Sequence, residues 1–361
     1  MKKPTNTRKG ACKEQAQKAS VIKLGLDVHA DSVSVVRQID GAVPQPAQKF
    51  TWGAFWKWAA KQLQQAEKVY SCYEAGPFGY GAHRTLTTLG IENIVVRPQN
   101  WDELGQGVKT DKRDALALAQ RLDRYVNGNT KALAVVYVPT PEQELARSQT
   151  RLREQMRKHR QQAEAQGRSM MLYYGIRVKG RWWLRERFIE LSTQVPEAVL
   201  KMVEYFRDLA LEMNKKVEEL TAQIEAAAAA KERPKGYGKL TAEVVAREVV
   251  DWNRFTNRRQ VASLTGLCPR VHGSGNKRSE GPVSKHGNPR IRKALVELAW
   301  RVSIYQPNYK PVKRWQSVLD SGKSAARKKA AVAIARQLAV DLWRINTNRA
   351  KAEDLGLALI S

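Results

Sequence analysis

The chain has 361 residues, of which 42% are hydrophobic, enough to form apolar cores in two or more domains. Lys and Arg number 63 against 35 Asp and Glu, so the net charge of +28 predicts a polyanionic partner such as nucleic acid. No apolar run approaches the roughly 20 residues that span a bilayer, and the basic N-terminus lacks the apolar core of a secretory signal, so we expect a cytoplasmic, nucleoid-associated protein. Three widely separated cysteines and five scattered histidines argue against a disulfide framework and against a zinc site.

The first section begins with a basic arm over residues 1–20, which we expect to be disordered. Alternating apolar residues then predict strands over residues 22–28 and 32–39 that join as a hairpin, and a third extended piece over residues 45–50. A helix follows over residues 51–67 with Thr51 as its N-cap. Its three tryptophans, Trp52, Trp56 and Trp58, are expected to pack on the sheet, with Trp58 pointing to a different face from the other two.

The remainder of this section alternates between strands and helices. The segment at residues 68–76 is predicted to form a buried strand that ends at Glu74, a helix that Gly90 ends comes next, and another strand over residues 91–98 follows. Thr110 is predicted to be the N-cap of the last helix. A strand hairpin followed by alternating helices and strands predicts a mixed sheet flanked by helices, and we place this α/β domain at residues 21–138.

The central section, residues 139–230, is predicted to be helical. Residues 141–166 and about 196–230 combine heptad-like spacing with dense charge, which is typical of an antiparallel coiled coil or a dimer arm. Packing of both helices on the protein's core is the alternative. The basic aromatic stretch between them contains Trp182 and Trp183, which either stack on nucleobases or anchor the two helices, and the second interpretation is slightly favoured.

The third section, residues 231–361, is predicted to be mainly helical with one glycine-rich loop. Ser274 lies between two glycines in this loop, in the segment HGSGNKRSEGPVSKHGNPR. A Gly-Ser-Gly sequence is most often a flexible turn, and a basic loop commonly binds phosphate without any chemistry. We expect the basic residues on and near this loop to contact nucleic acid: Arg270, Lys277, Arg278, Lys285, Arg290 and Arg292.

Four carboxylates in the first section fall at strand ends or at a helix start: Asp27, Glu74, Asp111 and Asp114. Singly, such acids are usually turn residues or part of a solvated, salt-bridged face. Gathered together they repel one another unless cations neutralise them, and Mg²⁺ prefers such oxygen ligands. Two ions about 4 Å apart would stabilise both oxygens of a phosphoryl transfer. The order strand, strand, helix describes a ribonuclease H-like metal site, with Lys109, Lys112 and Arg113 placed to hold a phosphate backbone.

Several of these segments resemble a known family. GLDVH around Asp27, YEAGPFGYG around Glu74 and VKTDKRDA resemble the DEDD insertion-sequence transposases, also called bridge-RNA-guided recombinases, which are related to the Piv-type DNA invertases. YGKLTAEVVAREVVDWNRFTNRRQVASLTGLCPRVHGSG and GPVSKHGNPRIRKALVELAW resemble the C-terminal transposase domain of that family. The resemblance covers nearly the whole chain from Val21 onward.

The resemblance implies a RuvC-like first domain whose four carboxylates bind two Mg²⁺ ions. It also implies a serine that attacks DNA and becomes covalently attached. Ser274 matches that serine best, and Ser279 and Ser284 are lesser candidates on the same loop. A serine hydroxyl needs activation, and metal ions held by the carboxylates would supply it.

The expected function is therefore that of an insertion-sequence transposase, a site-specific recombinase that cleaves and rejoins DNA strands through a phosphoserine intermediate. Donor and target DNA are the expected partners, in a homodimer or homotetramer, and a structured guide RNA is implied by the resemblance alone. A RuvC-like structure-specific endonuclease is the first alternative, because it would use the carboxylates and need no serine. A non-catalytic nucleic-acid-binding protein is the second.

Overall fold

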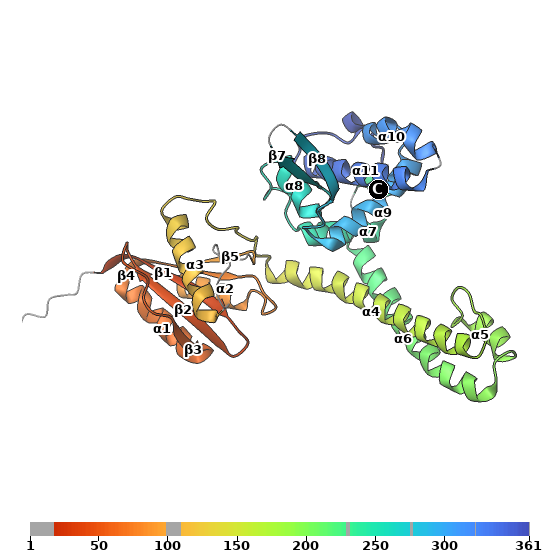
Figure 1. Ribbon diagram of the computed structural model, residues 1–361, viewed down its shortest axis with the longest axis horizontal. Coiled ribbons are helices and arrows are strands. Elements are labelled where there is room, and N and C mark those ends of the chain that lie inside the picture. Colours follow the sequence, from red (N-terminus) through yellow and green to blue (C-terminus); the bar gives the residue numbers. More distant parts are fainter. Residues whose placement is uncertain (1–17, 99–109, 229–231, 275–276, 322, 361) are drawn as a thin grey trace, which may run out of the picture. The chain divides into compact units, whose positions relative to one another are not determined.

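The computed structural model describes residues 18–98, 110–228, 232–274, 277–321 and 323–360, and divides the chain into two units at the Val138–Pro139 bond. The predicted basic arm before residue 18 lies outside the described residues. The first unit is an α/β unit (Figure 1) whose elements are β1 (Ala19–Val28), β2 (Ser32–Ile39), β3 (Gln48–Thr51), α1 (Trp52–Gln65), β4 (Ala66–Glu74), α2 (Gly81–Leu89), β5 (Glu92–Val96) and α3 (Asp111–Val126).

The sheet of the first unit has five strands in the order β3-β2-β1-β4-β5. β2 pairs antiparallel with both β1 and β3, whereas β4 runs parallel to β1 and to β5. The predicted hairpin, the third extended piece and the mixed sheet are thus confirmed. Thr51 and Thr110 occupy the predicted N-cap positions, although neither side chain makes a capping hydrogen bond, and Gly90 ends α2 in the left-handed conformation.

The two faces of this sheet are covered by different helices. Phe55 and Ala59 of α1 and Leu86 of α2 pack on the face that carries the even-numbered residues of β1, such as Leu24. The three tryptophans of α1 are partly buried against this core, as expected, and Trp58 packs there with Trp52 and Trp56 although its spacing suggested a different face. Helix α3 covers the other face and contacts β1, β2 and β4.

The second unit begins with a helical hairpin and ends in a compact helical core. Its elements are α4 (Pro141–Tyr173), α5 (Arg185–Ser192), α6 (Glu197–Ala226), β6 (Arg233–Pro234), α7 (Lys239–Val249), α8 (Arg258–Thr265), β7 (Pro269–Ser274), β8 (Lys277–Val283), α9 (Pro289–Tyr305), α10 (Lys310–Asp320), α11 (Ser324–Asn346), a 3-10 helix (Glu353–Leu355) and β9 (Leu359–Ile360). None of the described helices is both long and apolar enough to cross a bilayer.

Helices α4 and α6 lie antiparallel along their lengths (Figure 1). Arg153 of α4 donates a hydrogen bond to Thr221 of α6, and further along α4 Arg160 donates to Asn214. The buried residues of α6 recur mostly at seven-residue intervals, which is the heptad pattern of a coiled-coil seam: Val199, Val203, Ala210, Val217 and Ile224. The predicted pair of long helices is confirmed, and its use as a dimer arm stays a prediction.

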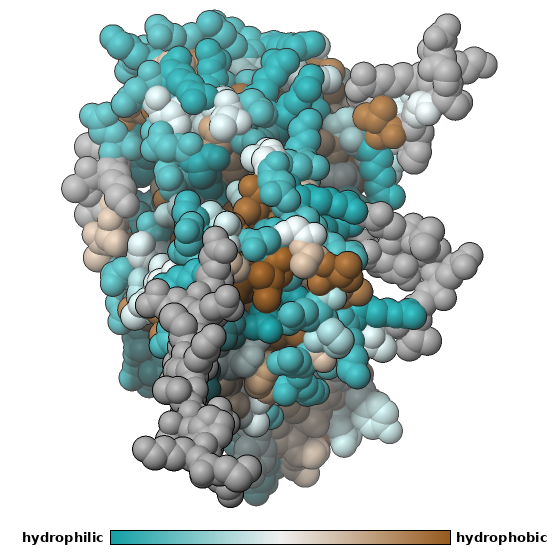
Figure 2. Space-filling view, turned by 90° about the vertical axis from the view of Figure 1, so that its left-hand side faces the viewer, coloured by the Kyte–Doolittle hydropathy of each residue, from teal (hydrophilic) through white to brown (hydrophobic). Residues whose placement is uncertain are grey.

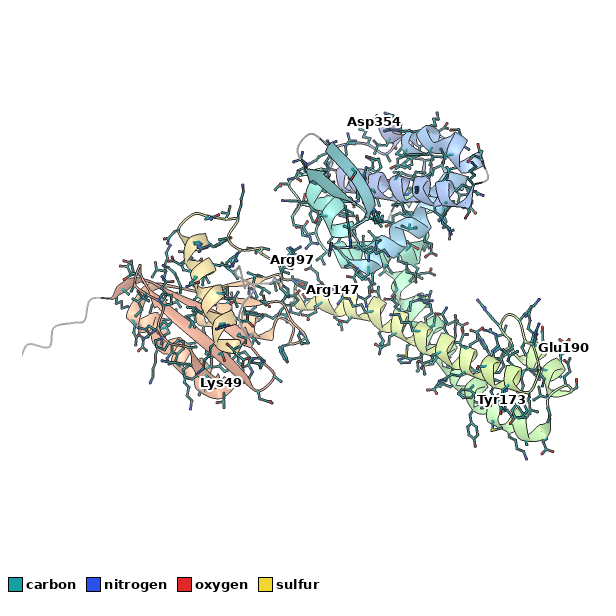
Figure 3. The ribbon with its side chains drawn as sticks, viewed as in Figure 1. Lys49, Arg97, Arg147, Tyr173, Glu190 and Asp354 are labelled. Carbon is teal, nitrogen blue, oxygen red and sulfur yellow. The ribbon has the colours of Figure 1, made fainter. Side chains whose placement is uncertain are left out.

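The basic aromatic stretch forms a small core at the distal end of this hairpin, the end at which Tyr173 and Glu190 lie in Figure 3. Trp182 and Trp183 are completely buried, and the Trp182 indole N–H donates to the carbonyl of Glu164 at 2.9 Å. Buried rings cannot stack on a nucleobase, so the interpretation of these tryptophans as anchors is confirmed.

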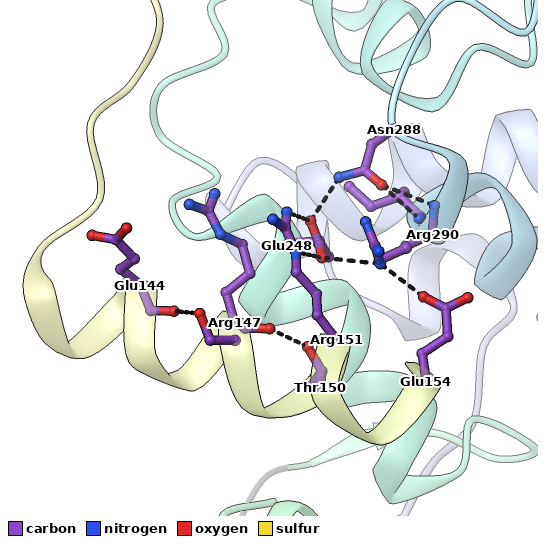
Figure 4. Close-up of polar contacts among 10 residues, drawn as sticks. Glu144, Arg147, Thr150, Arg151, Glu154, Glu248, Asn288 and Arg290 are labelled. Carbon is purple, nitrogen blue, oxygen red and sulfur yellow. Dashed lines mark hydrogen bonds and ion pairs between the residues drawn. The ribbon is translucent and has the colours of Figure 1, made fainter. Parts of the chain in front are cut away.

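A buried carboxylate ties the hairpin to the helical core of the same unit (Figure 4). Both oxygens of Glu248 on α7 accept hydrogen bonds of 2.9 Å from Arg151 of α4. Asn288 donates to Glu248 at 2.8 Å, and Arg290 of α9 donates to Glu154 of α4 at the same distance. Burial alone would raise the pKa of Glu248, but these donors and the arginine charges outweigh it and hold the pKa below its ordinary value.

The glycine-rich segment differs from its prediction. A loop was expected, yet residues 269–274 and 277–283 pair as the antiparallel strands β7 and β8, with Ser274 opposite Lys277. Ser279 therefore lies on a strand, and Ser284 follows directly after it. The error has a physical cause: glycine and serine mark turns by their conformational freedom, and that freedom does not prevent them from pairing as strands when neighbouring backbone groups supply hydrogen bonds.

Candidate metal and phosphate site

The position of α3 on the sheet determines where its first turn lies. A Cβ atom on Gly25 of β1 would come within 2.2 Å of the carbonyl oxygen of Ala115 and 2.4 Å of the amide nitrogen of Ala119. Only glycine lets the α3 backbone approach β1 so closely. Further along, buried Lys23 of β1 forms an ion pair with Asp123 near the end of α3. These contacts bring the start of α3 to the end of β1.

Two of the predicted carboxylates meet there around a histidine. The Nε2 atom of His29 lies 3.2 Å from a carboxylate oxygen of Asp27 and 3.2 Å from one of Asp111. Lys49 of β3 places its ammonium group 3.6 Å from the same Asp111 carboxylate. One ligand atom from each of Asp27, His29 and Asp111 lies within 4.8 Å of the other two, which is close enough to share one cation.

The electrostatics of this cluster favour a cation. Burial raises the pKa of Asp27 above its ordinary value; the His29 imidazole opposes the rise, and the carboxylates of Asp111 and Asp114 add to it. Asp114 is thus close enough to Asp27 for their charges to interact. A cation bound among these groups would relieve this repulsion, so the residues present fit a divalent metal ion.

The fourth predicted carboxylate, Glu74, is placed by strand register. β1 and β4 pair in parallel with Leu26 opposite Tyr73, so Asp27 and Glu74 stand one position further along their strands. Gly25 and Cys72 both face α3, since Cys72 contacts the Leu118 carbonyl at 3.5 Å. Side chains alternate along a strand, so Asp27 and Glu74 also face the α3 side of the sheet.

The predicted phosphate-binding residues fall into three groups. Lys112 and Arg113 are exposed in the first turn of α3, and Arg270 and Lys285 are exposed in the second unit. Lys109 and the side chains of Lys277 and Arg278 lie outside the described part of the chain, as does the side chain of Ser274.

The remaining two predicted residues are engaged within the protein. Arg290 pairs with Glu154 and lies 4.0 Å from Glu248, and Arg292 donates to the carbonyls of Thr265 and Lys285. Their proposed contacts with nucleic acid stay predictions, and in the structure both arginines hold their own unit together.

Three features of this site were not predicted from the sequence: the position of His29 between the carboxylates, the ammonium group of Lys49 near Asp111, and the close approach of the α3 backbone to Gly25 of β1. His29 directly follows the strand that carries Asp27, and that proximity was the one available signal. The face shown in Figure 2 is covered mainly by hydrophilic residues, with small apolar patches between them.

These observations define a basic α/β protein with a candidate cation site at one end of its sheet. Residues 232–313 match the family model described as the transposase IS116/IS110/IS902 family. The chain is 31% identical over 330 residues to a putative transposase, y4qE, of Sinorhizobium fredii. The alignment covers 80% of this chain and 78% of the relative. It is 25% identical over 279 residues, 74% of each chain, to the transposase for insertion sequence element IS1111A of Coxiella burnetii.

The chain therefore belongs to the IS116/IS110/IS902 family of transposases. Membership implies DNA transposition, with DNA as the substrate.

Proposed function

We propose that the chain cleaves and rejoins DNA strands with Mg²⁺ held by Asp27, Asp111, Asp114 and Glu74, in a first unit with a ribonuclease H-like, RuvC-like fold. The observation that carries the proposal is the meeting of Asp27 and Asp111 at His29. The strand order β3-β2-β1-β4-β5 with β2 antiparallel, and acids at the ends of β1 and β4 and at the start of α3, support it.

In the proposed reaction, Ser274 is the nucleophile. A bond forms between its Oγ and the phosphorus of the scissile phosphodiester, and the bond from phosphorus to the leaving sugar oxygen breaks. The serine loses its hydroxyl proton, and the leaving oxygen ends as a hydroxyl. Mg²⁺ would polarise the phosphate and stabilise the leaving oxygen. Attack by the freed hydroxyl of another strand reverses the step, so strands are exchanged without an external energy source.

We also propose a second component, a structured guide RNA that selects the DNA sites, in an assembly of two or four copies; both rest on the family resemblance, and the basic character of the chain merely permits the RNA. A net charge of +28 is compatible with binding two kinds of nucleic acid. Sequencing of the RNA that co-purifies at moderate salt tests this part. One discrete RNA with segments matching candidate DNA would support guidance, and a random mixture would contradict it.

A cleavage assay with Mg²⁺, on DNA carrying the segments that such an RNA specifies, tests the chemistry. Ser274→Ala and Asp111→Asn should each abolish a slow-migrating protein–DNA adduct formed by the wild type. Asp31→Asn is the matched control, because Asp31 is an exposed carboxylate in the turn just after β1. Free ends produced by Ser274→Ala would indicate a structure-specific endonuclease instead. If the wild type and Asp27→Asn both bound DNA and neither gave a cleavage product, the chain would be a non-catalytic DNA-binding protein.

A further inference from the structure

A pocket of about 290 Å³ opens at the same end of the sheet as the carboxylate cluster, on the face that α1 and α2 cover, and it shares His29 with the cluster. Its walls come from the start of α1, the end of β4 and the turn before α2, and its principal lining residues are His29, Trp52, Trp56, Tyr73 and Phe78. The other lining residues are small or aliphatic. The titratable side chains that line the pocket are therefore the His29 imidazole and the Tyr73 phenol. The pocket is therefore mainly aromatic.

The aromatic walls are held in place by hydrogen bonds. The Trp52 indole N–H donates to the carbonyl of His29 at 3.2 Å and to that of Ala30 at 3.0 Å. The ring of Trp56 stacks on Trp52 with centroids 5.0 Å apart. Tyr73 is almost fully buried, and its hydroxyl accepts from the His83 amide at 3.2 Å. A pocket fixed in this way needs little ordering when a ligand enters.

Phe78 is the exposed wall of the pocket. Its side chain is 47% exposed on the turn that connects β4 to α2. A large aromatic ring that served only the core would be buried, as Phe55 of α1 is at 0% exposure. An exposed ring facing a preformed aromatic pocket is instead suited to close over a flat ligand.

His29 connects the pocket to the carboxylates. Its backbone carbonyl holds Trp52 on the pocket side, and its side chain lies 3.2 Å from both Asp27 and Asp111. The phosphate of a nucleotide is joined to its base through one sugar. A strand whose phosphate lay at the carboxylates would therefore have to pass His29, at the end of β1, to place a base against the aromatic rings on the other face of the sheet.

We propose that this aromatic pocket holds one unstacked nucleobase of the strand whose phosphate occupies the candidate metal site; the inference rests on the proposed function of that site. Stacking on aromatic side chains accepts any base, because every base has a π-face. A base enters such a pocket only from single-stranded or locally opened nucleic acid, since a paired base must first leave its stack. The pocket thus selects opened strands rather than a sequence.

The test separates base contacts from phosphate contacts. The affinity of the full chain is measured for short oligothymidylate and for an abasic oligonucleotide of equal length, both with Mg²⁺ present, because the proposal places the phosphate of the strand at cation-neutralised carboxylates. The wild type should bind the oligothymidylate roughly five- to hundredfold more tightly, the range expected for stacking one base. Phe78→Ala should remove most of this preference and leave the affinity for the abasic strand unchanged, whereas Phe78→Trp should keep it.

Tyr173→Ala is the matched control, because Tyr173 is an aromatic residue with 85% exposure in the other unit. Three results would overturn the inference: an unchanged preference in Phe78→Ala, an equal loss of affinity for both strands, or an equal effect of Tyr173→Ala. Because the readout needs no strand cleavage, it stays informative if Asp111→Asn shows that the proposed metal chemistry is wrong.

Discussion

Replacing Gly25 with alanine tests whether the position of α3 controls the candidate metal site. The new Cβ would lie 2.2 Å from the carbonyl oxygen of Ala115, whereas ordinary contact begins near 3.4 Å. The three atoms that the new Cβ would crowd, Ala115 O, Ala119 N and Ala119 Cα, all belong to the α3 backbone, so α3 as a whole must move by about 1 Å. Such overpacking typically costs about 1–3 kcal/mol of unfolding free energy. A displacement of about 1 Å of catalytic groups can reduce the rate about a hundredfold, and α3 carries Asp111.

Urea unfolding gives the first quantity, and Mg²⁺-dependent formation of the protein–DNA adduct gives the second. Gly53→Ala is the matched control, because a Cβ at this position of α1 meets nothing within 4 Å. It should be neutral or stabilise the protein by up to about 1 kcal/mol, since alanine favours a helix over glycine. If Gly25→Ala matched Gly53→Ala in both stability and adduct formation, the close approach of α3 to β1 would not control the candidate metal site.

Three predictions concern the second unit. Gly167→Val should lower the unfolding free energy by about 1–3 kcal/mol, because even a Cβ would lie 2.3 Å from the buried Trp182 ring; unchanged urea unfolding would contradict this. Glu248→Gln should cost about 2 kcal/mol in the same assay, less than breaking a fully buried pair, because Arg151 is 40% exposed. The pKa of Glu248 is depressed in the folded chain, so its contribution to stability is complete above its ordinary pKa of 4.5 and is lost as the pH falls through the lower folded pKa. The difference in stability between wild type and Glu248→Gln should therefore shrink below pH 4.5, and a difference independent of pH would contradict this assignment.

Much of the first unit could be predicted because its signals are local. Apolar alternation identified β1 and β2, and a left-handed glycine at position 90 ended α2 where the sequence placed its stop. The acids at the ends of β1 and β4 could be proposed as neighbours because parallel strands bring their carboxyl ends together. Each of these inferences uses residues of a single helix or strand, or of two strands that are neighbours in the sheet.

The rest depends on contacts between residues far apart in sequence. Asp111 meets His29 across 82 positions, and the histidine itself gives no periodic signal. Gly25 looked like an ordinary strand residue, since the reason for glycine lies in the backbone of α3 rather than in β1. The hairpin of β7 and β8 was missed for a different reason: its composition is that of a turn, and only backbone pairing makes it a sheet.

The placement of two acids in the first turn of α3 has a structural reason as well as the proposed catalytic one. The N-terminus of a helix carries partial positive charge, so each acid there contributes about 0.3–1 kcal/mol to helix stability. The side chain of Thr110 makes no capping hydrogen bond at this helix start. The favourable interactions with the helix N-terminus therefore come from the two acids of the first turn, Asp111 and Asp114. The helix thereby offsets part of the repulsion that gathers around Asp27 before any cation binds. Asp111→Asn should consequently lower the unfolding free energy by no more than about 1 kcal/mol, while abolishing the adduct. Unfolding of the variant under conditions where Asp31→Asn stays folded would mean that Asp111 serves the fold rather than the chemistry.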